Sequence, residues 1–250
     1  MIRRLALALL LFGLVGTAPA RAVPVDVELI LAVDVARSID EEEAKLQRQG
    51  YLAALTDTGI VAAIRNGPVG KIAIAYIEWA GAAYQRIVVP WTVIGDIAGA
   101  TDFAARLAAQ PIAVENWTSI SAALDFAVPL FENNGFEGTR LVIDVSGDGR
   151  NNQGRPAADA RDDALRRGIV INGLPIMNDR PNFGRPPEKD LDIYYRENVI
   201  GGPGAFLIVA ENFTHFAQAI RSKMMREISG DPVWVAQAEK GADVRSGDIR

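Results

Sequence analysis

The sequence predicts an α/β fold: a doubly wound, mostly parallel sheet of about six strands, with one antiparallel edge strand and helices on both faces. Three observations predict it. Apolar runs of strand length alternate with segments of helical periodicity along almost the whole chain. The principal runs are continuously apolar, which is typical of parallel strands covered on both faces. One pair of runs is joined by a short glycine turn, which indicates a hairpin.

The first strand is the clearest of these elements. Residues 29–33 form an uninterrupted apolar run that stops at Asp34. Ser38 and Glu41 follow with the spacing of a capping box, which predicts that a helix begins there. In open α/β sheets, ligands bind outside the carboxyl ends of the strands, so the sequence predicts chemistry at the Asp34 edge.

The other elements follow in order along the chain. Pro90 suits the second hairpin strand to the sheet edge, because proline cannot donate to a strand ladder. Gly67-Pro68 ends the first helix, and an interruption at Thr58-Gly59 is an alternative to one long helix. The predicted strands are residues 69–80, 84–91, 139–146, 169–176 and 205–209, and the predicted helices are residues 40–66, 96–110, 119–133, 156–167, 191–199 and 213–228.

The first 22 residues have the pattern of a secretory signal. Arg3 and Arg4 precede an apolar run over residues 5–15, and Ala20-Arg21-Ala22 is a small-x-small cleavage site. We therefore expect a periplasmic or secreted protein cleaved near Ala22, with no stable membrane span in the mature chain; an uncleaved anchor is the alternative. One domain over residues 25–229 and a loose tail over residues 230–250 complete the predicted organisation.

The composition excludes several kinds of site and partner. The chain has no cysteine, which excludes disulfides, thiolate metal sites and a thiol nucleophile. Loss of the signal would remove three arginines and no acidic residue, which moves the formal net charge from −5 to −8. An acidic protein is a poor partner for nucleic acid and for anionic membranes. Its negative net charge makes binding of cations more favourable.

Three loops at the predicted carboxyl edge of the sheet carry oxygen-bearing side chains. Asp34 and Ser38 lie on the first loop, Thr118 on the second, and Asp148 after the central strand. Carboxylate and hydroxyl oxygens suit a hard divalent cation, with Mg²⁺ first and Mn²⁺ or Ca²⁺ as alternatives. Mg²⁺ keeps several waters, so a few protein oxygens suffice to hold it.

These residues resemble the metal-ion-dependent adhesion site of von Willebrand factor A-type (vWA) domains. The family pattern is D-x-S-x-S on the first loop, a threonine on the second and an aspartate on the third, and the resemblance covers roughly residues 25–229. It implies that Asp34, Ser38, Thr118 and Asp148 are metal ligands, directly or through water. It also implies a partner, a protein or peptide whose acidic side chain completes the metal shell, and a place among secreted bacterial vWA proteins of unassigned function.

One position departs from the pattern, because Ala36 stands where the first serine is expected. A water could replace that ligand at some cost in affinity. The alternative is a degenerate, metal-free site on a scaffold that binds through another surface. Ser38 and Thr118 would then be helix caps and Asp148-Gly149 a turn.

The sequence predicts a binding module rather than an enzyme, since no nucleophile elbow, P-loop or dinucleotide-binding turn is found in the right context. A metal-dependent hydrolase using both aspartates is the alternative. We expect the lone His215 to be a packing or surface residue.

Several other polar and aromatic residues have a structural and a functional interpretation. Asp144 is expected to be a satisfied polar residue of its strand, and Glu78 needs a partner if it is buried, with a place behind the metal site as the alternative. Exposed tryptophans could anchor a partner. The tryptophans concerned are Trp91, Trp117 and Trp234. We expect Asn116, Asn151 and Asn152 to be loop-forming residues.

Overall fold

The computed structural model describes residues 22–177 and 188–230. The predicted signal peptide, most of the polar segment 178–189 and the tail lie outside the described residues. The described strands are β1 (Val23–Asp34), β2 (Ile72–Trp79), β3 (Gln85–Ile94), β4 (Phe136–Gly147) and β5 (Ile169–Pro175). The helices are α1 (Glu41–Leu55), α2 (Thr58–Arg65), α3 (Ile97–Ala108), α4 (Ile120–Ala127), the 3₁₀ helix η1 (Val128–Phe131), α5 (Ala157–Arg166), α6 (Leu191–Asn198) and α7 (Phe216–Ser229).

The described strands form one sheet in the order β3-β2-β1-β4-β5. Strand β1 pairs in parallel with both β2 and β4, and β4 pairs in parallel with β5. Strand β3 is antiparallel to β2 and lies at the edge, as the hairpin and Pro90 predict. The predicted fold class, a mostly parallel α/β sheet with one antiparallel edge strand, is therefore confirmed.

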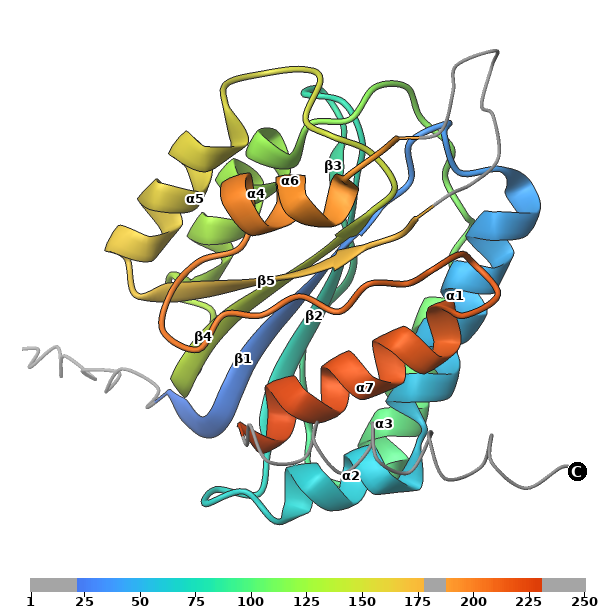
Figure 1. Ribbon diagram of the computed structural model, residues 1–250. Coiled ribbons are helices and arrows are strands. Elements are labelled where there is room, and N and C mark those ends of the chain that lie inside the picture. The colour runs from blue at the N-terminus through green and yellow to red at the C-terminus, as the bar shows by residue number, and fades with distance from the viewer. Residues whose placement is uncertain (1–21, 178–187, 231–250) are drawn as a thin grey trace, which may run out of the picture.

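Helices cover both faces of this sheet (Figure 1). Helices α4, α5 and α6 pack on one face, where Ile30, Ile143 and Ile171 point. Helices α1, α2, α3 and α7 pack on the other, over Leu29 and Leu31. Successive β1 residues thus enter opposite cores, which explains why its sequence is continuously apolar rather than alternating. Burial of these two clusters is the main stabilising term of the fold.

The predicted strand over residues 205–209 is wrong, and the described sheet has five strands rather than about six. This segment joins β5 only through isolated bridges, one of them between Gly173 and Leu207. Regular pairing with β5 is interrupted because the Phe206 amide donates to a side-chain oxygen, Asn172 Oδ1 at 3.1 Å, and not to a backbone carbonyl of β5. A polar side chain that captures a backbone donor interrupts regular pairing.

Two predicted helices are divided in the structure. The first is interrupted where the alternative placed it, because Asp57 caps α2 by accepting from the Gly59 and Ile60 amides at 2.9 and 3.0 Å. The second, over residues 119–133, becomes α4 and then η1, which has a proline in its first turn. Proline lacks the amide that an α-helix needs there, so the tighter helix follows.

A buried ionic cluster joins the sheet to α7. Lys223 Nζ lies 2.7 Å from Asp144 Oδ1 and 2.5 Å from Glu227 Oε1, and Asn172 donates to the same Glu227 oxygen at 3.0 Å. All three charged side chains are at most 1% exposed. Asp144 is thus the partnered polar strand residue that the sequence predicts. Because two carboxylates share one ammonium group, burial and the negative charge of Glu227 raise the pKa of Asp144 to about 7.

We predict that Lys223→Met lowers the free energy of unfolding by about 3–5 kcal/mol, because it leaves two buried carboxylates without their cation. Urea unfolding at neutral pH measures this. Lys45→Met is the matched control, since Lys45 pairs with Glu41 on the exposed surface and its loss should leave the midpoint unchanged. Equal midpoints for the two variants would contradict the prediction.

We also predict a pH dependence that Asp144 sets. Its carboxyl group binds a proton more tightly in the folded state, with a pKa of about 7, than in the unfolded chain, where the ordinary value is 3.8. The contribution of Asp144 to the free energy of unfolding should therefore fall as pH rises from about 4 to about 7. Urea unfolding across this range should show a flatter dependence for Asp144→Asn than for the wild type. Parallel curves for both proteins would contradict this assignment.

Candidate metal site

Two aspartates meet at the carboxyl edge of the sheet because β1 and β4 are parallel neighbours. Val33 is paired with Ser146, so the next residues, Asp34 and Gly147, end their strands side by side. Asp148 follows directly. The sheet topology therefore brings together two carboxylates that are more than a hundred residues apart in sequence.

Asp34 is completely buried. Its Oδ1 accepts a hydrogen bond from the Ala36 amide at 2.7 Å, whereas its Oδ2 has no hydrogen-bond partner among the described residues. Burial, followed by the negative charge of Asp148, raises the pKa of the Asp34 carboxyl well above its ordinary value, and backbone donors offset only part of this. An ionised Asp34 is thus costly unless a positive charge lies beside it.

Ser38 belongs to this site and does not cap α1. The predicted capping box of Ser38 and Glu41 is wrong, because the helix begins later and Asp40 is its N-cap. The Asp40 carboxylate accepts from the Glu43 amide at 2.8 Å, and the Glu43 carboxylate accepts from the Asp40 amide at 2.9 Å. The Ser38 hydroxyl instead donates to Asp148 Oδ1 at 2.6 Å.

Thr118 comes to the same place from the second loop. A Cβ built on Gly149 would lie 3.4 Å from Thr118 Oγ1, so this hydroxyl lies beside the residue that follows Asp148. Thr118 is held there by its backbone: its amide donates to Asn152 Oδ1 at 2.9 Å, and its carbonyl accepts from the Asn152 amide at 2.8 Å. The four predicted ligand residues are thus gathered at one edge, while their role toward a metal stays a prediction.

Amide side chains of the third loop fix the second loop in position. Asn151 Oδ1 accepts from the Ser121 amide at 3.0 Å, and the Gln153 carbonyl accepts from the Ser119 hydroxyl at 2.8 Å. The Gln153 side chain reaches the turn between β2 and β3, where its Oε1 accepts from the Ala82 amide at 2.6 Å. Asn151 and Asn152 are therefore loop-forming residues, as the sequence predicts. Sequence reasoning missed Gln153, although the run of three amide residues after a turn was a usable signal.

Ala36 provides no oxygen side chain where the vWA pattern has serine. Its methyl group is buried beside Val35 and Ala80, and its backbone forms a single parallel bridge with Glu115. The first loop therefore provides one carboxylate and one hydroxyl. With Thr118 and Asp148, the donor set is two carboxylates and two hydroxyls, and the described residues contain no group of three or more acidic or histidine side chains placed to hold a metal.

Glu78 is explained by a structural role. Its buried carboxylate pairs with Arg48 at 2.7 Å and with Arg86 at 3.0 Å, so both oxygens are occupied. The alternative that placed Glu78 behind the metal site gains no support from these contacts. His215 is an exposed residue at the start of α7, as expected for a surface residue.

The predicted aromatic contact residues have different environments. Trp91 donates to the Leu130 carbonyl at 2.9 Å and packs on Phe131, so it belongs to the fold. Trp117 is 58% exposed and has a left-handed backbone with φ of 67°. It lies directly before Thr118. Trp234 lies outside the described residues.

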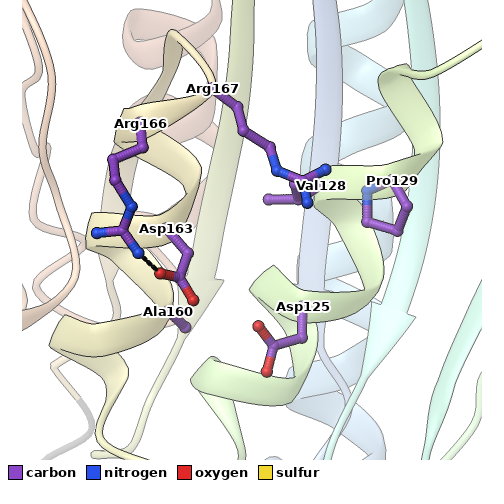
Figure 2. A pocket seen from close by; sticks show the side chains of 7 residues that line it. All are labelled: Asp125, Val128, Pro129, Ala160, Asp163, Arg166 and Arg167. Atoms are coloured by element: carbon purple, nitrogen blue, oxygen red, sulfur yellow. Dashed lines mark hydrogen bonds and ion pairs between the residues drawn. The ribbon is translucent and has the colours of Figure 1, made fainter.

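A surface hollow of about 340 Å³ is lined by residues of α4, η1 and α5, and none of the four predicted ligand residues lines it (Figure 2). Its charged side chains pair with one another and with their neighbours: Arg166 with Asp163, and Arg167 with Glu132. Arg155 pairs with Asp125. Because its charges are already paired, the hollow is a weaker candidate for a ligand site than the strand edge.

The chain has a vWA-like fold. Among the solved structures that share the fold is proximal thread matrix protein 1 from the mussel byssus, with 12% identity and a TM-score of 0.57 over 82% of this chain and 47% of that chain. The pilus adhesin SpaC from Lactobacillus rhamnosus GG has 11% identity and a TM-score of 0.58 over 85% of this chain and 31% of that chain. A von Willebrand factor type A protein from Catenulispora acidiphila has 11% identity and a TM-score of 0.56 over 82% of this chain and 43% of that chain. This chain thus spans less than half the length of each.

The chain belongs to the family described as protein of unknown function (DUF1194), whose model matches residues 24–232. No curated protein matches the chain. Among residues 22–177 and 188–230, no helix has the length and apolar character needed to cross a membrane.

We predict that Asp34→Asn stabilises the protein by about 1–3 kcal/mol in EDTA at neutral pH, because the amide keeps the acceptor for Ala36 and removes a buried charge beside Asp148. Urea unfolding measures this. Asp26→Asn is the matched control and should destabilise, since the buried Asp26 carboxylate already accepts from the Val69 and Gly70 amides at 2.9 Å each. A comparable loss of stability in both variants would contradict the prediction.

Proposed function

We propose that this chain is an exported binding module that engages a protein or peptide partner through a divalent cation held by Asp34, Ser38, Thr118 and Asp148. The strongest support is the aspartate pair: two neighbouring carboxylates, at most 6% exposed, with one Asp34 oxygen that has no hydrogen-bond partner in the described structure. Buried charges of one sign are retained in proteins where a counter-charge or metal compensates them.

The donor chemistry favours Mg²⁺, with Mn²⁺ or Ca²⁺ as alternatives. All the side-chain donors are oxygens, and Mg²⁺ retains waters, so the missing hydroxyl at Ala36 weakens binding without preventing it. When bound, the cation supplies an open coordination position that an acidic side chain of the partner can occupy. Asp34 and Asp148 would balance the charge of the cation, while Ser38 and Thr118 would orient it.

Proteins of the same fold support binding as the role. Another structure of proximal thread matrix protein 1 is described with zinc in its MIDAS motif, the metal-ion-dependent adhesion site (12% identity, TM-score 0.55). SpaC is described as a pilus adhesin. One is thus a matrix protein and the other an adhesin. By analogy we assign this chain to binding rather than to catalysis, and residues 1–22 to its export.

Trp117 is suited to contact the partner beside the cation. A left-handed backbone at a bulky residue costs about 1–3 kcal/mol, and such strain is concentrated at functional sites. Here it accompanies a largely exposed indole directly before Thr118, with Val114 of the same loop 47% exposed. An apolar contact beside a metal-bound carboxylate would add affinity that the incomplete metal site lacks.

We predict that the mature wild-type protein, freed of metal, binds one Mg²⁺ or Mn²⁺ in calorimetric titration. Asp148→Ala should abolish the heat, and Ala36→Ser should tighten binding about tenfold, because it restores a hydroxyl where the family pattern has one. Ser121→Ala is a matched control for loss of a hydroxyl, since the Ser121 hydroxyl donates to Asn151 Oδ1 and has no hydrogen bond with either aspartate among the described contacts.

The calorimetric outcomes separate the two functions considered. Heat in Ala36→Ser alone would show that the native site is degenerate, which favours a metal-free scaffold that binds through another surface. No heat at millimolar metal in the wild type or in Ala36→Ser would overturn the metal-dependent function altogether.

A further inference from the structure

Tyr195 of α6 presents one of several buried polar atoms that have no hydrogen-bond partner within the described structure. Its side chain is completely buried and packs in the core cluster with Ile143 and Ile171. Its hydroxyl has no hydrogen-bond partner among the described residues. A phenylalanine would fill the same apolar space without burying an unsatisfied hydroxyl, so the oxygen needs an explanation of its own.

The position of the hydroxyl gives that explanation. A Cβ on Gly147 would lie 3.0 Å from the Tyr195 hydroxyl and 2.7 Å from Asp34 Oδ2. The two unpartnered buried atoms, one from α6 and one from β1, therefore converge on the same glycine, at the end of the strand that carries Asp148. Any larger residue at Gly147 would displace one of them.

A second glycine places the ring. A Cβ on Gly173 of β5 would lie 2.9 Å from Tyr195 Cδ1, so the ring packs directly against the β5 backbone. Gly173 thus admits the ring and Gly147 admits its hydroxyl, on two neighbouring strands. The two glycines thus leave space for the ring and for its hydroxyl, which lies near the Asp34 carboxylate.

We propose that Tyr195 is a positioning residue of the cation site, whose hydroxyl donates through one bound water to Asp34 Oδ2 and fixes this carboxylate toward the cation. This inference rests on the proposed function. Donors behind metal ligands hold those ligands in orientation, and their loss typically lowers metal affinity 10–100-fold. Tyr195 would thus restore part of the metal affinity that is lost because Ala36 has no hydroxyl group.

The test compares Tyr195→Phe with Tyr51→Phe. Tyr51 is equally buried on the opposite face of the sheet, where its hydroxyl is bonded to Ser146 Oγ at 3.0 Å. Tyr195→Phe should keep or raise the melting temperature of the metal-free protein and lower Mg²⁺ affinity about tenfold in calorimetry. Tyr51→Phe should lower the melting temperature and leave Mg²⁺ affinity unchanged.

A spectroscopic measurement on the wild type keeps the test decisive if Tyr195→Phe folds poorly. Addition of Mg²⁺ should produce a tyrosine signal in the near-ultraviolet difference spectrum of the wild type and of Tyr51→Phe. Wild-type affinity in Tyr195→Phe, or no tyrosine signal in the wild type, would overturn the role of Tyr195 while metal binding stands. Absence of Mg²⁺ and Mn²⁺ binding by the wild type would instead overturn the proposed function, and the role of Tyr195 with it.

Discussion

The electrostatic repulsion between two buried carboxylates is the constraint on which the rest of this site depends. Parallel pairing of β1 and β4 puts Asp34 and Asp148 at one edge, and packing removes both from water. Three other buried acidic side chains are paired with cations: Glu78 has two arginines, and Asp144 shares Lys223 with Glu227. Among the described residues, no such cation faces the Asp34 oxygen. The contrast within one molecule is what points to a cation from outside.

The elements around this pair limit its freedom to relax. The third loop holds the second through its amide side chains, so Thr118 cannot move away without breaking bonds at Asn152. Asp34 is itself held by the hydrogen bond that its Oδ1 accepts from the Ala36 amide. A rigid, preformed set of oxygens binds a cation with little reorganisation, and it also prevents the carboxylates from escaping their repulsion. Stability without the metal and affinity for it are therefore opposed in this design.

The fold could be predicted from the sequence because its signals are local. Continuous apolar runs such as residues 29–33, and a proline on the edge strand, determine most of the sheet without reference to distant contacts. The failures came from contacts between distant residues. Residues 205–209 have strand composition, but the Asn172 side chain captures the Phe206 amide. Ser38 has the spacing of a cap, but Asp40 takes that role.

The candidate site was predictable in part for the same reason. The aspartates and hydroxyls follow strand ends in sequence, so topology alone brings them together. Tyr195 carries no such signal, because a tyrosine in an amphipathic helix is ordinarily a core residue. Only the close approach of its hydroxyl and of Asp34 Oδ2 to Gly147 shows that the two atoms lie near each other.

Anomalous diffraction from crystals of the mature protein grown with Mn²⁺ tests the central claim most directly, because it locates the ion. We expect one strong anomalous peak at the edge where β1 and β4 end, within coordination distance of the oxygens of Ser38, Thr118 or the two aspartates, and no such peak in Asp34→Asn crystals. A peak elsewhere on the molecule, or ordered protein at this edge with no peak, would contradict the account.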